Sequence, residues 1–215
     1  MAYADQYRFP QPTSGVVFPS KGNDLLLHTE WSVIPRTEIY LRYQHKISEE
    51  KTIVQNKSGF SNSVHEELSV RHIRLHLGYR LNNSVNINSR IEDVNVHWNI
   101  SDKHEKGLVV YQDISIKPSE QYSWNARFTF FQTDSYESRI YEYENDLEGV
   151  SSLPGLYGHG VRWYILFHYK LGGSLELSAK YSDLIRDDVK RLGSGLDELP
   201  VNHDNRFSFQ IDYAL

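Results

Sequence analysis

Hydrophobic and polar residues alternate with a period of two along several stretches of this chain. In the clearest stretch, 161–171, one set of alternate positions is apolar: Val161, Trp163, Ile165, Phe167, Tyr169 and Leu171. The positions between them carry mostly polar side chains, and the alternation resumes after Gly172-Gly173. Successive side chains of a strand point to opposite faces, so the pattern predicts two long antiparallel strands joined by a tight turn.

The same alternation predicts further strand pairs, with short turns at 34–37, 82–83 and 117–120 and a last strand at 207–215. Between 85 and 98 the apolar positions change face near Glu92, which predicts a bulge or a strand break. No window shows sustained helical periodicity. The chain is therefore predicted to be all-β, with residues 1–23 as a partly extended N-terminal segment and the strands in 24–215.

Short turns alternate with longer segments, which predicts long loops at 48–66, 133–160 and 183–205. Three strands that end at a short turn or at the terminus carry a Tyr two positions before a final Leu: Tyr79, Tyr169 and Tyr213. The apolar strip at 161–171, at ~3.3 Å per residue and a tilt of ~40°, covers roughly 25 Å, the height of the apolar band of outer-membrane barrels. These features predict an antiparallel up-and-down transmembrane β-barrel of about ten strands.

In such a barrel the apolar face meets lipid and the polar face lines the lumen. The residues predicted to face lipid are Trp163, Ile165, Phe167, Tyr169, Phe209, Ile211 and Tyr213. The predicted polar wall of the lumen is Arg42, His72, Arg74, His76 and Arg80. This wall either favours anions or has its charges paired with Glu92, Glu176 or Asp212. A shared metal ion at His72 and His76 is excluded, because positions i and i+4 of a strand lie ~13 Å apart.

Composition narrows the class of protein further. No apolar run approaches the ~20 residues of a transmembrane helix, while barrel strands need no such run. The net charge of −5 argues against a nucleic-acid partner, and the absence of cysteine removes thiol chemistry. The N-terminal sequence MAYADQYRFP lacks the basic and apolar regions of a signal peptide. The chain is then expected to be a processed or partial form of a longer protein, or not to be exported.

Two groups of loop residues resemble a metal site and a catalytic site. The acidic residues at 142–148 suggest Ca²⁺, but their order does not match an EF-hand loop, so a solvated acidic surface loop is the preferred interpretation. His159 with Ser151 and Ser152 suggests a hydrolase, but no nucleophile elbow accompanies them. No catalytic, cofactor-binding or metal-binding residue is predicted. The glycines between 149 and 160 instead predict a folded loop that plugs the barrel or meets a partner.

Four stretches resemble the C-terminal barrel region of long outer-membrane proteins of Bacteroidota and their relatives, which carry an N-terminal helix-hairpin-helix segment. They read DLLLHTEWSVIPRTEIYLRYQ, LVVYQDISIKP, FQTDSYESRIYEYENDLEGVSSLPGLYGHGVRWYIL and GSGLDEL. The resemblance covers most of the chain from about Asp24. It implies that this chain is the C-terminal part of a larger barrel. No nucleic-acid link is carried over, because the helix-hairpin-helix part is missing here.

The predicted function is that of a non-enzymatic barrel protein of the bacterial outer membrane, acting as a pore or as a scaffold within an envelope assembly. Its partners would be the lipid bilayer and either other envelope proteins or a missing upstream barrel segment. Strand parity requires one more N-terminal strand, expected at about 7–18. The edges near 24–33 and 206–215 are expected to pair with each other or, preferably, with strands outside this sequence. The alternative is a soluble β-barrel that binds an apolar ligand inside, with the two faces inverted.

Overall fold

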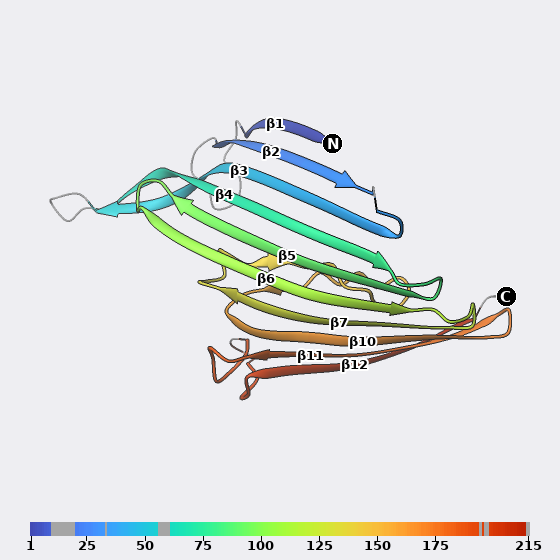
Figure 1. Cartoon of the computed structure of the whole chain (residues 1–215). Coiled ribbons are helices and arrows are strands. Elements are labelled where there is room, and N and C mark those ends of the chain that lie inside the picture. The colour runs from blue at the N-terminus through green and yellow to red at the C-terminus, as the bar shows by residue number, and fades with distance from the viewer. Residues whose placement is uncertain (10–19, 33, 56–60, 194, 196–197, 214–215) are drawn as a thin grey trace.

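The structure is a computed structural model that describes residues 1–9, 20–32, 34–55, 61–193, 195 and 198–213. Ten strands form one strongly curved antiparallel sheet (Figure 1). They are β1 (Ala2–Phe9), β2 (Ser20–Trp31), β3 (Thr37–Gln55), β4 (Ser61–Arg80), β5 (Val85–Trp98), β6 (Lys103–Ile116), β7 (Tyr122–Thr133), β10 (His159–Leu171), β11 (Leu175–Arg186) and β12 (His203–Tyr213). The two remaining strands, β8 (Ile140–Tyr141) and β9 (Gly155–Leu156), pair with each other.

Each sheet strand pairs with its neighbours in chain order, so the topology is up-and-down. The connections at one end of the sheet are short: 32–36, 81–84, 117–121 and 172–174. The tightest of these contains Gly172, whose φ of 72° is readily available only to glycine. At 81–84 the Asn82 side chain accepts a hydrogen bond from the Ser84 amide at 2.8 Å, an Asx turn that closes the β4–β5 hairpin. The predicted all-β, antiparallel, up-and-down fold with about ten strands is confirmed.

Cross-strand register keeps the two faces of the sheet chemically distinct. One transverse row of paired residues is apolar from β3 to β10: Leu41, Leu75, Ile91, Val110, Phe130 and Val161. We call the face that carries this row the outer face. The opposite face, which carries Arg42, Arg74, Glu92, Arg127 and Lys180, is the inner face. Because side chains alternate along every strand, this register separates apolar from polar residues across the sheet.

Two predictions about the strands are wrong. Residues 48–66 do not form a loop, because β3 continues to Gln55 and β4 begins at Ser61, with 56–60 outside the described residues. From Ser48 to Thr52 β3 is polar on both faces, so this part lacks the apolar alternation by which strands are recognised. The bulge near Glu92 is also absent, since β5 pairs in continuous register with β4 and β6. The apolar residues Val94, Val96 and Trp98 lie on the inner face, where they are buried.

The ends of the sheet differ from prediction as well. The additional N-terminal strand exists, but it is β1 at 2–9, and residues 10–19 lie outside the described part of the chain. As a result β2 pairs on both sides, with β1 and with β3, and does not form an edge. Strands extend into the predicted loops at 133–160 and 183–205, so that 134–158 and 187–202 connect the strands. Leu215, predicted to close the last strand, lies outside the described residues.

Among the described strands, β1 pairs only with β2 and β12 only with β11, so the sheet is open along these two edges. Within the described residues, no helix has the length and apolar character needed to cross a membrane.

Candidate functional site

The predicted lipid-facing residues all lie on the outer face, as their register with neighbouring strands shows. Ile165, Phe209, Ile211 and Tyr213 are exposed in the isolated chain. The rings of Trp163, Phe167 and Tyr169 are partly covered by one another and by outer-face rings of β7 and β11: Trp124 lies 4.3 Å from Phe167 and Tyr181 lies 5.4 Å from Trp163, between ring centroids. The outer face of these strands thus carries a surface of apolar and aromatic side chains.

Aromatic side chains of the outer face gather where the strands reach the short turns. The three predicted tyrosines, Tyr79, Tyr169 and Tyr213, are joined there by Trp31, Tyr122 and Trp124. Tyr122 pairs directly across the sheet with Tyr169, so two of these rings lie at one level. Tyr and Trp have apolar rings with a polar group, which suits the boundary between lipid and water.

The predicted polar wall lies on the inner face of β3 and β4, where two of its members share one carboxylate. Glu92 of β5 is buried and accepts from His72 Nδ1 at 3.1 Å and from Arg74 Nε at 2.5 Å. His76 stacks on Tyr40 with 4.6 Å between ring centroids. Arg42 donates to Gln44 at 3.3 Å, and Arg80 is exposed at the end of β4. Glu92 therefore neutralises the charge at the centre of this wall.

The connection 134–158 folds back over the inner face, and we call it the inserted segment. Figure 1 shows it in yellow, lying behind β5 and β6 in this view. The β8–β9 pair and a bridge between Glu144 and Ser152 give it the form of a small hairpin. Glu142 and Glu144 point toward the sheet with 1% and 2% of their surface exposed, whereas Tyr141 and Tyr143 between them point away. The predicted solvated acidic surface loop is therefore wrong at these two positions.

Glu144 is the most heavily paired residue of the inserted segment. Its carboxylate accepts from Arg162 of β10 through Nε at 2.5 Å and Nη2 at 3.0 Å, and from Lys180 Nζ of β11 at 3.4 Å. Lys180 also donates to Asp146 at 2.7 Å. Arginine binds a carboxylate through two parallel hydrogen bonds, which fix orientation as well as charge. These contacts hold the middle of the inserted segment against two strands of the sheet.

Glu142 lies beside a second ion pair. Arg127 of β7 binds Asp113 of β6 through Nε at 2.5 Å and Nη2 at 2.8 Å, and it donates to the Tyr143 carbonyl at 2.7 Å. Arg90 Nη1 donates to one oxygen of Glu142 at 2.9 Å, while the other oxygen has no hydrogen-bond partner among the described residues. Burial raises the pKa of Glu142 above its ordinary value, although the positive charge of Arg90 acts in the opposite direction.

Apolar side chains complete the contact between the segment and the sheet. Ile140 and Leu156 of the segment join Val94, Val96, Val109 and Phe131 in one buried cluster, and Leu147 packs with Tyr164 and Leu166. Each fully buried aliphatic or aromatic side chain of this kind contributes about 1.5–3 kcal/mol. The inserted segment is therefore anchored by burial at both ends and by ion pairs in its middle.

The sequence placed Arg90 and Lys180 on the inner face but did not show that cations there bind the segment. Four strands supply these cations, and only cross-strand pairing brings them together: Arg90, Arg127, Arg162 and Lys180. A usable signal was the spacing of Glu142 and Glu144, since acids at i and i+2 with Tyr between them predict one charged face of an extended segment. The hydrolase set is not assembled: Ser152 donates to Glu144 at 3.4 Å, and His159 is exposed at the start of β10.

No protein-family model and no curated protein matches the chain. Two solved structures have a similar fold. The NanC porin in its rhombohedral crystal form has a TM-score of 0.42 and 9% identity, over 99% of this chain and 98% of that one. The outer membrane transporter YddB from Escherichia coli has a TM-score of 0.42 and 8% identity, over 95% of this chain and 34% of that one. At this level neither similarity assigns a function, and the resemblance to helix-hairpin-helix outer-membrane proteins stays a prediction.

Proposed function

We propose that this protein is a non-enzymatic β-barrel protein of the bacterial outer membrane, and that it acts as a pore or as a scaffold within an envelope assembly. Strands cross a membrane only where their polar backbone groups are paired within a sheet, and such sheets carry apolar side chains toward lipid. Barrels of this kind are typical of outer membranes, which is the reason for the proposed location.

The observation that carries the proposal is the inverted burial of the two faces. On β7, Phe128 is 55% exposed and Phe130 is 43% exposed. Arg127 of the same strand, which contacts β6 and the inserted segment, is only 7% exposed. A protein surrounded by water buries the phenylalanines and exposes the arginine. The row of paired apolar residues on the outer face runs across six strands, from β3 to β10, whereas a soluble monomer rarely exposes contiguous apolar surface of more than a few hundred Å². Lipid is the solvent that such a surface fits.

The alternative, a soluble barrel with an apolar ligand inside, needs Trp163, Ile165 and Phe167 to line the interior. These residues lie on the outer face, and the inner face opposite them carries Arg162 and Lys180. The apolar part of the inner face is already packed by Ile140 and Leu156 of the inserted segment. The inner face therefore offers ion pairs and filled apolar contacts, which favours the membrane proposal.

The proposal is tested by extraction and by gel migration. We expect the protein to fractionate with outer membranes and to leave them only in detergent. The extracted protein should show β-type circular dichroism and should migrate differently before and after heating. A monodisperse protein in plain buffer, with no change of migration on heating, would contradict the proposal. Conductance in planar bilayers then separates a pore, which gives steps of current, from a scaffold, which gives none.

A further inference from the structure

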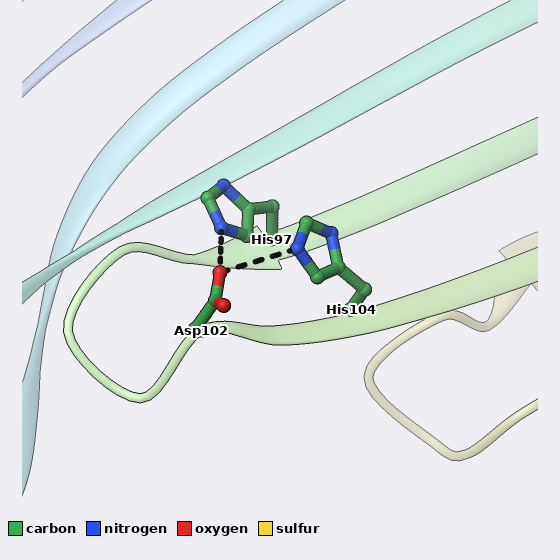
Figure 2. Close-up of side chains that lie close together, drawn as sticks. All are labelled: His97, Asp102 and His104. Atoms are coloured by element: carbon green, nitrogen blue, oxygen red, sulfur yellow. Dashed lines mark hydrogen bonds and ion pairs between the residues drawn. The ribbon is translucent and has the colours of Figure 1, made fainter.

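Three side chains with metal-binding atoms meet at the β5–β6 hairpin, away from the inserted segment. His97 and His104 are direct cross-strand partners, and their rings stack with 4.1 Å between centroids. Asp102, from the turn between the strands, places Oδ1 3.4 Å from His97 Nε2 and 3.4 Å from His104 Nε2. Figure 2 shows the carboxylate directed at both imidazoles. One ligand atom from each residue lies within 4.8 Å of the other two.

These separations match those of a tetrahedral metal centre. Zn²⁺ binds His nitrogen and carboxylate oxygen at about 2.0–2.2 Å, so two ligands of one tetrahedron lie about 3.3–3.6 Å apart. Both nitrogen–oxygen distances of the cluster fall in this range. The two imidazole rings stack only 12° from parallel, so each ring must rotate to direct its Nε2 lone pair at a shared ion. Imidazole favours transition metals over Ca²⁺ and Mg²⁺, which prefer sites made of oxygen alone. The donor set therefore selects a divalent transition metal.

The hairpin is held in this arrangement before any ligand binds. Buried Glu66 of β4 accepts hydrogen bonds from the amides of Ile100 and Ser101 at 3.0 and 2.6 Å, and from the Ser101 hydroxyl at 2.8 Å. Asp102 has a φ of 51°, a left-handed conformation that Asp tolerates better than most residues. Pairing with β4 thus fixes the turn that presents Asp102. A backbone that is already ordered loses less conformational entropy on binding, and only the two imidazole side chains then have to turn.

The cluster is also accessible. His97 has the same parity on β5 as Ile91 of the apolar row, so it faces outward, away from the inserted segment. It lies beyond that row toward the end of the strand, and the outer-face positions between them, Asp93 and Asn95, are polar. Asp102 and His104 are exposed. An ion can therefore reach the cluster from water, with one coordination position left for a water molecule or an external donor.

We propose that His97, Asp102 and His104 bind one Zn²⁺ ion at the β5–β6 hairpin, each through a single atom. No metal site was predicted from the sequence, because His72 and His76 lie too far apart on one strand and the acidic residues at 142–148 do not match an EF-hand loop. His97 and His104 converge only through the register of two strands. The proposal does not depend on the membrane function, since it rests on the local geometry of one hairpin.

The test is titration of the full chain, folded in detergent micelles, with Zn²⁺ alone by calorimetry. We expect one ion per chain at the site. His97→Ala and His104→Ala should each lower the affinity at least about tenfold, because loss of a residue that only supports a metal ligand already lowers affinity by about 10- to 100-fold. Metal binding to imidazole is opposed by protons, so the apparent affinity should fall as the pH is lowered. In Co²⁺-loaded protein, the visible absorption should have the intensity of tetrahedral coordination.

Two further variants make the result decisive. Asp102→Asn keeps a residue that tolerates the left-handed conformation but removes the charge, and it should weaken Zn²⁺ binding. His203→Ala removes an exposed imidazole of β12 outside the cluster and should leave this binding unchanged. Gel migration of each variant verifies its fold. Zn²⁺ binding that is absent, or equally strong in His104→Ala and in the unaltered protein, would overturn the proposal.

Discussion

Ile165→Arg places a charge where the proposed function expects the middle of the bilayer. Ile165 is the central residue of β10 and lies on the outer face between Ala126 and Tyr181. With ~3.3 Å per residue and a strand tilt of ~40°, the height between its Cα and either end of the strand, measured along the barrel axis, is about 15 Å. An Arg side chain destabilises a barrel most at that depth, because its charged group is far from both lipid–water interfaces.

The expected cost can be stated for both solvents. Arg at the midplane of a barrel in lipid costs about 2–4 kcal/mol, which lowers the folding equilibrium by about 30- to 700-fold. If the outer face met water, Ile165, which is 43% exposed, would be a surface position. Surface substitutions of that kind change stability by about 0.5 kcal/mol or less. The free energy of unfolding of one variant therefore distinguishes lipid from water.

The assay is urea unfolding in phospholipid vesicles, followed by the fluorescence of the four tryptophans. His168→Arg is the matched control, since it lies three residues along the same strand but on the inner face. There His168 Nδ1 is 2.8 Å from Ser178 Oγ and 3.4 Å from Glu176 Oε1, so an Arg finds a carboxylate partner. We expect a change of no more than about 1 kcal/mol for this control. Equal destabilisation by the two variants, or none by Ile165→Arg, would refute the assignment of the faces.

Two further predictions concern the inserted segment and the sheet edges. Glu144→Ala leaves Arg162 and Lys180 without their shared partner. This should weaken docking of the segment by about 3–5 kcal/mol and make the segment sensitive to proteolysis. Glu148→Ala, at an exposed position of the same segment, should have neither effect. Glu142→Gln should weaken docking less than Glu144→Ala, because burial already raises the pKa of Glu142 and disfavours its charge. Equal protease sensitivity of the three variants would contradict the role given to the ion pairs. We also expect β1 and β12 to pair with strands outside these ten in the membrane, so their amides should be protected from hydrogen exchange while cysteines introduced into the two strands do not crosslink within one chain. A crosslink between them would show closure instead.

The fold could be predicted from the sequence because the outer face obeys one simple rule. Lipid requires apolar side chains at every second position of a spanning strand, and this period is visible in 161–171 without any knowledge of neighbours. The rule stops applying where strands leave the apolar band. Residues 48–52 of β3 are polar on both faces, so this part looks like a loop although Ser48, Glu49 and Glu50 remain paired with β4.

Contacts on the inner face could be predicted only in part, because they depend on which strands are neighbours. The apolar shift in β5 was visible, but a bulge and an apolar inner patch produce the same pattern. The patch exists because Ile140 and Leu156, from the distant inserted segment, cover it. Likewise Glu144 could be recognised as acidic, yet its burial follows from Arg162 and Lys180 on two other strands. The local sequence therefore determines which face of the sheet a side chain points to, while the order and register of the strands determine which residue it contacts.

The inserted segment determines how the two parts of the proposed function can be separated. A sheet of ~10 strands, even when closed, encloses little more than its own side chains. Here the inner face of β5, β7, β10 and β11 is covered by the segment, whose acids neutralise Arg90, Arg162 and Lys180. A solute can therefore pass only if additional strands widen the barrel or if the segment moves. Moving it breaks buried ion pairs and exposes Ile140, Leu147 and Leu156. In a barrel of these ten strands alone the segment fills the interior, which favours the scaffold, whereas strands added at β1 and β12 would leave room for the open pore.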